Sequence, residues 1–385
     1  MNAYQIKVPS NVYSGEGSVS KIKEIIKKEK AKHILVFGDK GIVANGLADI
    51  LFEELNETGC IYRLYDELVA EPSYQEVEKV ITNAKDFPSD LMIALGGGSV
   101  MDTAKLYSVL KDADYSVKDL LDDPTIAKKG IRSVMIPTTC GTGSEATCNA
   151  IVAVPEQQSK QGIVNEAMIP DYVILDSQMI RKLPNKIVAA TGVDALAHVV
   201  ECYTSKKATP LSNTYAMAGA KLIFQNIRKA YAEPDNMEAK GNMMLGAFYG
   251  GIAITGSGTT AVHALAYPLG GKYHIAHGVS NAILFAHVMK YNQEACEVQL
   301  AELCDGVYPE MVQKTTQEKA EFVIEEIANI VKETKIPTDL SEFGVKKEDL
   351  EFLIQAGSQQ KRLLVNNRRE LSFNDIRAIY EKVVK

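Results

Sequence analysis

The sequence predicts an α/β domain with a parallel sheet over residues 1–183, followed by an all-helical domain over residues 184–385. Three observations support this prediction. A chain of 385 residues is too long for one compact core. Its first half alternates short β-branched runs with helical patterns, whereas only helical periodicity follows Leu183-Pro184. No Ser/Gly-rich linker separates the halves, so we expect two packed lobes with a cleft between them.

Five short apolar segments of the first half are expected to be strands: residues 33–39, 60–66, 91–97, 132–139 and 172–176. Helical patterns lie between them at residues 41–55, 73–84 and 99–111. Strands that are almost continuously apolar are typical of a parallel sheet covered by helices on both faces.

The second half has the apolar periods of long helices at residues 187–203, 214–231, 238–254 and 259–265, and beyond residue 280. The segment Pro268-Leu269-Gly270-Gly271 is expected to end the fourth of these helices and to let the chain return.

Composition excludes several classes of protein. A net charge of −7 gives no general attraction to nucleic acid or to an anionic membrane. No signal peptide and no apolar run approaching 18 residues is visible. The six cysteines show no paired spacing, so we expect reduced thiols in a cytoplasmic protein.

Three of the six histidines and one aspartate have the spacing of metal ligands. Asp194 and His198 are four residues apart, so on a helix they project from one face. His263 and His277 lie in a second, glycine-rich stretch. One carboxylate and three imidazoles suit a divalent metal such as iron(II) or zinc(II). For Asp194 and His198 alone an ordinary polar pair on a helix face is the favoured interpretation, and the other two histidines shift the balance to the metal.

Three glycines and a serine, Gly96 to Ser99, stand between an apolar strand and the start of a helix. Glycines allow a backbone to approach a pyrophosphate closely, and the helix N-terminus favours its negative charge. Ser99 could also cap this helix. The spacing is not GxGxxG, so a tight structural turn is the alternative.

A second polar loop, residues 137–145, follows the next strand, and its hydroxyls and glycines suit ribose and phosphate. Asp39 ends the first expected strand, where a carboxylate could accept both hydroxyls of an adenosine ribose and repel a 2′-phosphate. A simple turn aspartate is the alternative.

Taken together, these stretches resemble the iron-containing (group III) alcohol dehydrogenases over essentially the whole chain, with lactaldehyde (propanediol) oxidoreductases nearest in pattern. GGGSxxDxAK is met at residues 96–105 and PTTxGTGSE at 137–145. GxDALxHxxE is met at 192–201 and HxxxxPLGGxxxxxHGxxNA at 263–282. The resemblance implies a Rossmann-like N-terminal domain, a helical C-terminal domain, and a metal and a nicotinamide meeting in the cleft.

Residue by residue, the resemblance makes Asp194, His198, His263 and His277 the metal ligands, with iron(II) (Fe2+) expected and zinc(II) (Zn2+) possible. The cofactor, NAD, would be held at its pyrophosphate by Gly96, Gly97, Gly98 and Ser99, and at its adenine side and ribose by Thr138, Thr139 and Thr142. Positions lining the cofactor would be Asp102, Lys160 and Met179. For Lys160 a plain surface lysine is the alternative.

Three positions depart from the family pattern. A histidine often seen four residues after the third ligand is Tyr267, and because an unperturbed tyrosine titrates near ~10, a histidine-like base role is not expected of it. An Asn-Pro in the cofactor half is Glu71-Pro72, and a Phe-Ser-Asn segment before the third ligand is Ile254-Thr255-Gly256. The last change predicts a wider, more polar substrate wall.

The expected activity is reversible hydride transfer between NAD(H) and a small primary alcohol or aldehyde, with a plain alkyl substrate and one that carries a second polar or anionic group as the two options. Tyr267 or His274 would pass the proton, although His274 could equally be a packed loop residue. A small-molecule substrate, no nucleic acid, no membrane and a homodimer or larger homo-oligomer are expected. The alternatives are a dehydroquinate-synthase-like or glycerol-dehydrogenase-like enzyme on the same scaffold, or a non-catalytic assembly module.

Overall fold

The computed structural model describes residues 3–385, and contacts within it divide the chain into two compact units. The α/β unit comprises Lys7–Pro155 and Gln161–Leu183, and the helical unit contains Pro184–Lys385. Residues 3–6 and Glu156–Lys160 also belong to the helical unit, so this division differs from a single boundary after residue 183. Part of the reason lies at Ser159, which accepts a hydrogen bond from Gln360 (3.1 Å) and packs closely against Gly271.

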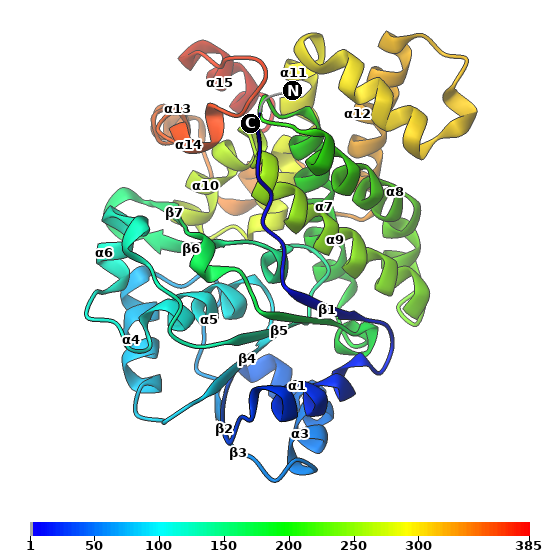
Figure 1. Ribbon diagram of the computed structural model, residues 1–385. Coiled ribbons are helices and arrows are strands. Elements are labelled where there is room, and N and C mark those ends of the chain that lie inside the picture. The colour runs from blue at the N-terminus through cyan, green and yellow to red at the C-terminus, as the bar shows by residue number, and fades with distance from the viewer. Residues whose placement is uncertain (1–2) are drawn as a thin grey trace. The chain divides into compact units, whose positions relative to one another are not determined.

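A six-stranded parallel sheet forms the centre of the α/β unit, with strand order β1-β8-β5-β4-β2-β3 (Figure 1). The strands are β1 (Asn11–Ser14), β2 (His33–Phe37), β3 (Ile61–Tyr65), β4 (Leu91–Gly96), β5 (Ser133–Pro137) and β8 (Tyr172–Leu175). Its helices are α1 (Ile22–Glu29), α2 (Lys40–Ala44), α3 (Leu47–Asn56), α4 (Tyr74–Ala84), α5 (Gly98–Leu110) and α6 (Val117–Asp122). This architecture confirms the predicted fold class.

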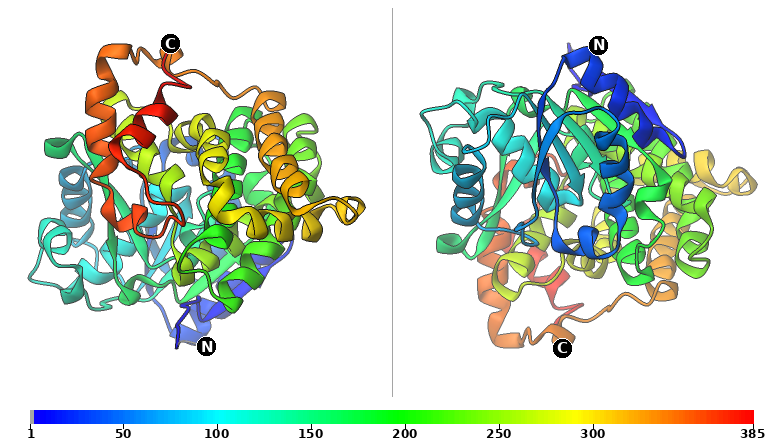
Figure 2. Two further views of the ribbon diagram at one scale, coloured as in Figure 1. Left: turned by 90° about the horizontal axis from the view of Figure 1, so that it is seen from above. Right: turned by 90° about the horizontal axis from the view of Figure 1, so that it is seen from below.

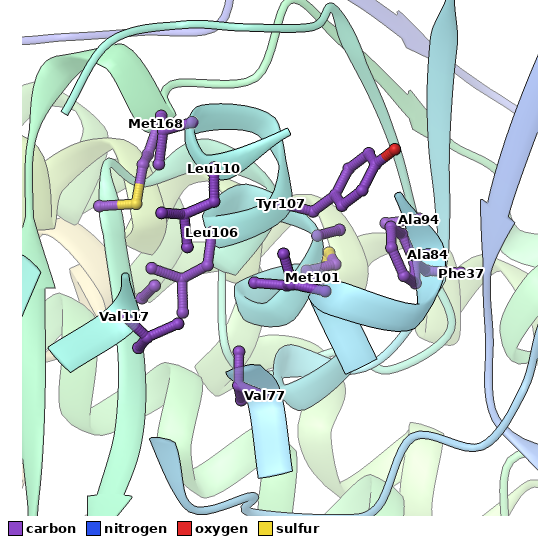
Figure 3. Close-up of a cluster of buried hydrophobic side chains, with 14 of the residues drawn as sticks. Phe37, Val77, Ala84, Ala94, Met101, Leu106, Tyr107, Leu110, Val117 and Met168 are labelled. Carbon is purple, nitrogen blue, oxygen red and sulfur yellow. The ribbon is translucent and has the colours of Figure 1, made fainter. Parts of the chain in front are cut away.

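Alternate residues of each central strand enter different cores, which is why these strands are apolar throughout. Leu35, Phe37, Met92 and Ala94 join one apolar cluster with residues of α4, α5 and α6 (Figure 3). The intervening strand residues join a second cluster with residues of α1 and α3 on the other face. The right-hand view of Figure 2 shows helices on both sides of the sheet. The sheet is therefore buried on both faces, as parallel sheets require.

Several local elements differ from expectation. The edge strand β1 and the two-stranded sheet of β6 (Asn149–Val154) and β7 (Ser159–Val164) were not predicted. β1 and β7 contain several polar residues, and β6 is apolar but alternates buried and half-buried positions, unlike the central strands, which are buried throughout. The helix expected over residues 41–55 is broken into α2 and α3, because Gly46 adopts a left-handed conformation (φ 68°).

The helical unit contains the predicted long helices, with boundaries shifted by a few residues. They are α7 (Asn185–Thr204), α8 (Pro210–Ala232), α9 (Met237–Ser257), α10 (Ala261–Tyr273), α11 (His277–Val307), α12 (Thr316–Glu333), α13 (Leu350–Ser358), α14 (Lys361–Leu364) and α15 (Phe373–Tyr380). Among the described residues, no helix combines the length and apolar character needed to cross a membrane.

The predicted helix break at Pro268 is wrong. Pro268 lies inside α10, which continues to Tyr273 because the flanking Leu265 and Leu269 are completely buried and hold this segment in the core. The helix ends instead at His274, a left-handed C-cap with φ 54° whose backbone N–H bonds back to Gly270. This tight end lets His277 start α11 close to the helix that carries His263.

Candidate active site

Asp194 and His198 lie one turn apart on the interior of α7, where both side chains are almost completely buried. The Asp194 Oδ1 and His198 Nε2 atoms are 4.0 Å apart. Helix α9 approaches this turn closely at Gly250, where an added Cβ would lie 3.4 Å from the His198 Cβ. The glycine therefore permits the close packing that encloses this part of α7.

Two further helices direct histidines at the same carboxylate. His263 lies in the first turn of α10, and its Nε2 atom is 3.6 Å from Asp194 Oδ1. His277 begins α11, and its Nε2 atom is 3.7 Å from the same oxygen. At Gly278, α11 lies directly against the Ala190 backbone of α7, so only a glycine fits there. The structure thus brings all four sequence-predicted ligands around one oxygen atom.

These donor atoms fit a divalent metal ion. Metal bonds of about 2.0–2.2 Å place neighbouring ligand atoms roughly 3.0–3.5 Å apart. The distances from Asp194 Oδ1 are only a few tenths of an ångström longer, and the ligand atoms of Asp194, His263 and His277 all lie within 4.8 Å of one another. His198 lies just outside this group of three, with its ring stacked on that of His263 at 4.6 Å. A small movement of His198 would complete a set of one oxygen and three nitrogens, which suits iron(II) or zinc(II).

Asn281 and Glu201 contact the candidate ligands and were missed as site residues, although both lie within the quoted motifs. The Asn281 amide donates to Asp194 Oδ1 at 2.6 Å and lies 3.2 Å and 3.3 Å from the Nε2 atoms of His263 and His277. Glu201 accepts a short hydrogen bond from His263 Nδ1. An uncharged amide gives little chemical signal in a sequence. Glu201 lies one turn beyond His198 and contacts a residue 62 positions away in the sequence. Its contact with His263 can therefore be recognised only from the folded structure.

Electrostatics within the cluster oppose the effect of burial. Burial alone would raise the pKa of Asp194, but the neighbouring histidines, chiefly His198, hold it below its ordinary value. For His263, burial lowers the pKa, yet the carboxylates of Glu201 and Asp194 raise it well above its usual range. Burial and the Lys160 ammonium hold the pKa of His277 below its ordinary value. The cluster therefore keeps Asp194 ionised, as a metal ligand must be.

The two proton-transfer candidates lie in different surroundings. The Tyr267 side chain is buried on α10, with its ring 5.9 Å from the His277 ring. His274 is exposed, and its left-handed backbone forms the end of α10. The geometry therefore favours Tyr267 over His274 as a neighbour of the cluster.

Lys160 is buried rather than a plain surface lysine. A Cβ added at Gly270 would lie 2.8 Å from the Lys160 Nζ atom, so the glycine leaves room for this side chain beside α10. After burial, the Lys160 ammonium is a further cause that lowers the pKa of His277. Lys160 is thus associated with the metal-ligand cluster in the helical unit.

The polar loops of the α/β unit lie at the carboxyl ends of adjacent strands. From β2 the chain goes first to β3 on one side and then to β4 on the other, so the strand order reverses between β2 and β4. Open parallel sheets bind ligands at such a switch point. Asp39 follows β2, and Gly97 to Ser99 follow β4. Asp39 and the glycine turn therefore lie at the switch point of this topology.

The glycines between β4 and α5 are also needed for packing within the α/β unit, because neighbouring side chains leave little or no room for a Cβ atom. An added Cβ would lie 2.5 Å from Val100 at Gly96, 3.2 Å from Thr139 at Gly97 and 2.9 Å from Thr142 at Gly98. The predicted cap at Ser99 is wrong. Gly97 is the N-cap of α5, and the Ser99 hydroxyl accepts from the Glu71 backbone N–H at 2.9 Å. The helix N-terminus thus begins one residue earlier, directly at the glycines.

The threonines of the loop after β5 differ in their hydrogen bonds. The Thr138 N–H donates to the Gly96 carbonyl at 3.0 Å, which fixes this loop to the glycine turn. The Thr142 hydroxyl accepts from the Ser144 N–H at 3.3 Å. Among the described residues, the buried Thr139 hydroxyl has no hydrogen-bond partner. An orphaned hydroxyl beside the glycine turn fits a polar ligand there.

Asp102, Asp39 and Met179 have structural contacts of their own. The Asp102 carboxylate accepts from the Ser144 hydroxyl (2.5 Å) and the Ile151 N–H (2.9 Å), and it pairs with Lys105. Asp39 caps α2 through the Ile42 N–H at 3.0 Å and is half-buried. Met179 follows β8 and is completely buried in an apolar cluster of the sheet, and its contact with the cofactor stays a prediction.

The segment predicted to be a polar substrate wall uses its hydroxyls internally. The Thr255 hydroxyl donates to the Ile252 carbonyl at 2.8 Å, and the Ser257 hydroxyl donates to the Ala253 carbonyl at 3.0 Å. Gly256 packs against Ile6 and Ser212 at 3.2–3.3 Å from an added Cβ. Neither hydroxyl hydrogen is therefore available to an anionic substituent.

Comparisons with known proteins agree with this site. Residues 9–177 match the family model of iron-containing alcohol dehydrogenase, and residues 188–384 match the C-terminal model of the Fe-containing alcohol dehydrogenase family. The chain is 38% identical to long-chain-alcohol dehydrogenase 1 of Geobacillus thermodenitrificans, covering 99% of this chain and 97% of the relative. It is 30% identical to sulfoacetaldehyde reductase of Bilophila wadsworthia, covering 96% of each chain.

A solved structure of 1,3-propanediol oxidoreductase superposes with a TM-score of 0.94 at 28% identity, covering 99% of this chain and 100% of that one. Both halves of the sequence thus match one family, and the same family describes the fold and the donor set. The chain belongs to the iron-containing alcohol dehydrogenases.

Proposed function

We propose that this enzyme transfers hydride between NAD(H) and a primary alcohol or its aldehyde, at a divalent metal held by Asp194, His198, His263 and His277. The observation that carries the proposal is the convergence of three imidazole nitrogens on Asp194 Oδ1. Iron(II) is the expected metal, and zinc(II) suits the same donors. When bound, the metal would act as a Lewis acid on the substrate oxygen and lower the pKa of the alcohol.

The protein would contribute orientation and proton handling. Asp194, His198 and His263 are buried, where electrostatic interactions are strong, and the partly exposed His277 completes the donor set. The buried Tyr267, beside His277, supplies a hydroxyl that can donate or accept the alcohol proton. We propose Tyr267 as the proton-transferring residue and assign no such role to the exposed His274.

For the nicotinamide cofactor, we propose the glycine turn after β4 and the threonine loop after β5, with Asp39 facing the adenosine ribose. The switch point between β2 and β4 and the orphaned Thr139 hydroxyl support this placement. A carboxylate at Asp39 favours NAD over NADP. A relative from Bacillus methanolicus, 29% identical over 90% of this chain, is named an NAD-dependent methanol dehydrogenase.

An alkyl alcohol or aldehyde is the substrate that we propose first. The Thr255 and Ser257 hydroxyl hydrogens are donated within α9, and an anionic group needs donors. The Geobacillus relative acts, by its name, on long-chain alcohols. The second candidate is a short aldehyde with a second polar or anionic group, which the name of the Bilophila relative favours.

The experiment is a metal-restoration assay with both cofactors. Purified enzyme is stripped with a chelator, restored with iron(II) or zinc(II), and assayed with NADH or NADPH on alkyl aldehydes and on sulfoacetaldehyde. We expect activity only after metal restoration and with NADH preferred. Full activity in the stripped enzyme, or no activity with any aldehyde after restoration, would contradict the proposal.

A further inference from the structure

The Glu201 side chain contacts both the N-terminus of helix α10 and the ring of His263, a candidate ligand on that helix. Glu201 lies on α7, seven residues after Asp194 and three after His198, and its side chain is completely buried. Positions separated by three and seven residues share one face of a helix. Glu201 therefore lies on the ligand-bearing face of α7, and both of its carboxylate oxygens are occupied.

One oxygen of Glu201 binds the start of helix α10. The Oε1 atom accepts from the Thr260 hydroxyl (2.6 Å), the Thr260 N–H (3.2 Å) and the Val262 N–H (2.8 Å). Thr260 is the N-cap of α10, but its own side chain makes no capping hydrogen bond. The carboxylate from α7 thus satisfies the orphan donors of this helix end and complements its dipole.

The other oxygen binds a ring in the same helical turn. Glu201 Oε2 contacts His263 Nδ1 in a short hydrogen bond. A carboxylate at Nδ1 accepts a hydrogen bond, so Nδ1 keeps its proton and Nε2 is the nitrogen that can give up its proton and offer a lone pair to a metal. The Nε2 atom lies on the side of Asp194 Oδ1, 3.6 Å away.

We propose that Glu201 is the positioning residue for His263, setting both its place in the fold and the tautomer that allows its Nε2 to bind the metal. This inference rests on the proposed metal site and adds a residue outside the ligand set. One buried carboxylate would hold the α10 backbone and the imidazole in a single geometry. The competing explanation is that Glu201 only caps α10.

A glutamine at this position separates the two explanations, because it has the same shape but only one acceptor atom. If its oxygen faces the α10 N–H groups, its NH2 faces His263 Nδ1. The ring must then carry its proton on Nε2, and it loses the metal-binding lone pair. If the amide turns over, the α10 donors lose their acceptor. Glu201→Gln can therefore satisfy only one of the two sides.

The test is a zinc titration of metal-free wild-type enzyme and of Glu201→Gln, in competition with a chromophoric chelator. We expect the zinc dissociation constant of Glu201→Gln to be about 10- to 100-fold higher than that of the wild type. Thr260→Val is the matched control, because it removes one donor to Oε1 and leaves the Oε2 contact with His263. Its dissociation constant should stay within about threefold of wild type, following the same second-sphere reasoning.

The outcomes are distinct. If Glu201→Gln binds zinc like the wild type while His263→Ala binds it weakly, the positioning role is wrong and the metal site stands. If His263→Ala also binds zinc like the wild type, the metal site itself is wrong. Equal weakening by Glu201→Gln and Thr260→Val would show that Glu201 acts only as a cap.

A spectroscopic measurement covers the case in which Glu201→Gln does not fold. With only six histidines in the chain, long-range ¹⁵N–¹H NMR of zinc-loaded wild-type enzyme can assign the tautomer of His263. We expect the proton on Nδ1. A proton on Nε2 would overturn the inference.

Discussion

The Lys105 Nζ atom lies 2.9 Å from Asp102 Oδ1 inside the α/β unit, and the lysine side chain is completely buried. The same ammonium donates to the Ser144 carbonyl at 3.1 Å, to the Thr147 hydroxyl at 3.0 Å and to the Asn149 carbonyl. Helix α5 is thereby joined to the loop that follows β5. Two loops proposed to hold NAD thus depend on one buried cation.

We expect Lys105→Met to lower the free energy of unfolding by about 3–5 kcal/mol, because it leaves the Asp102 carboxylate buried without its counter-charge. The Michaelis constant for NAD should also rise, since the loop after β5 loses two hydrogen bonds and the start of β6 loses one. Urea unfolding and steady-state kinetics measure both effects. Lys111→Met is the matched control, because Lys111 pairs with a largely exposed Asp112 at 3.7 Å and should cost less than about 1 kcal/mol. Equal effects of the two substitutions would contradict the role of Lys105.

Replacement of a candidate ligand should remove the metal without unfolding the chain. His263→Ala and His277→Ala are each expected to abolish activity and to lower the bound metal, measured by elemental analysis of purified protein. The secondary structure should largely survive, because α10 and α11 have extensive buried apolar faces. His287→Ala, also on α11 but outside the cluster, should retain both metal and activity. Wild-type activity at full occupancy in His277→Ala would show that the ligand assignment is wrong.

Cofactor preference provides a test of Asp39. We expect the wild type to prefer NADH to NADPH, and Asp39→Gly to reduce that preference, because the carboxylate repels a 2′-phosphate. Asp39 also caps α2, so Asp39→Asn is needed as the second variant: it keeps a capping oxygen and removes the charge. Both variants should shift the ratio of kcat/KM values. Comparable kcat/KM for the two cofactors in the wild type would count against the proposal.

Stability should depend on pH through Glu145, which is buried in the loop after β5. Burial raises its pKa from 4.5 in the unfolded chain to about 7 in the folded protein. Below pH 4.5 the group is protonated in both states. Between pH 4.5 and 7 only the unfolded chain releases the proton, so stability falls as pH rises. Above pH 7 the cost is constant, at up to about 3 kcal/mol.

Glu145→Gln removes this titration, so its stability relative to the wild type should increase from pH 5 to pH 7 and level off above pH 8. Thermal unfolding in a pH series measures the difference. Glu318→Gln is a control of opposite sign, because hydrogen bonds from Thr315 lower the pKa of Glu318. Its effect should disappear as the pH falls through the acidic range. A flat difference for Glu145→Gln would contradict the raised pKa.

Sequence patterns predicted the central strands and long helices because these elements are buried on a regular period. These patterns failed where the conformation of a single residue determines whether a helix breaks or continues. Gly46 breaks a continuous helical pattern, and Pro268 does not break one, since burial of its neighbours outweighs one lost hydrogen bond. The ligand set was visible because histidines are rare in this chain. The contacts of Glu201 and Asn281 depend on helices that are distant in sequence, so only the fold reveals them.

Thr255 shows a second limit. Its residue type suggested a hydroxyl-bearing substrate wall. In the structure the Thr255 hydroxyl donates within its own helix. A sequence shows which groups are present, but not which of them are already occupied by contacts inside the protein.

The internal hydrogen bond of the Thr255 hydroxyl leads to a prediction of substrate preference. Because the Thr255 hydroxyl hydrogen is donated to the Ile252 carbonyl, we expect alkyl substrates to be favoured over sulfonated ones. Each added methylene that is buried contributes ~0.8 kcal/mol, so kcat/KM should rise about fourfold per methylene until the pocket is filled. A series of straight-chain aldehydes, with sulfoacetaldehyde as the anionic member, measures this dependence.

Thr255→Val keeps the shape of the side chain and removes the hydroxyl. It should change the ratio of alkyl to sulfonated kcat/KM less than about twofold, well below the discrimination of a site that pairs a polar group. Thr214→Val on α8, where the hydroxyl donates to the Pro210 carbonyl in the same way, controls for loss of such a bond elsewhere. If Thr255→Val selectively lost activity on sulfoacetaldehyde, the hydroxyl would contact the substituent after all, and the polar substrate would become the better assignment.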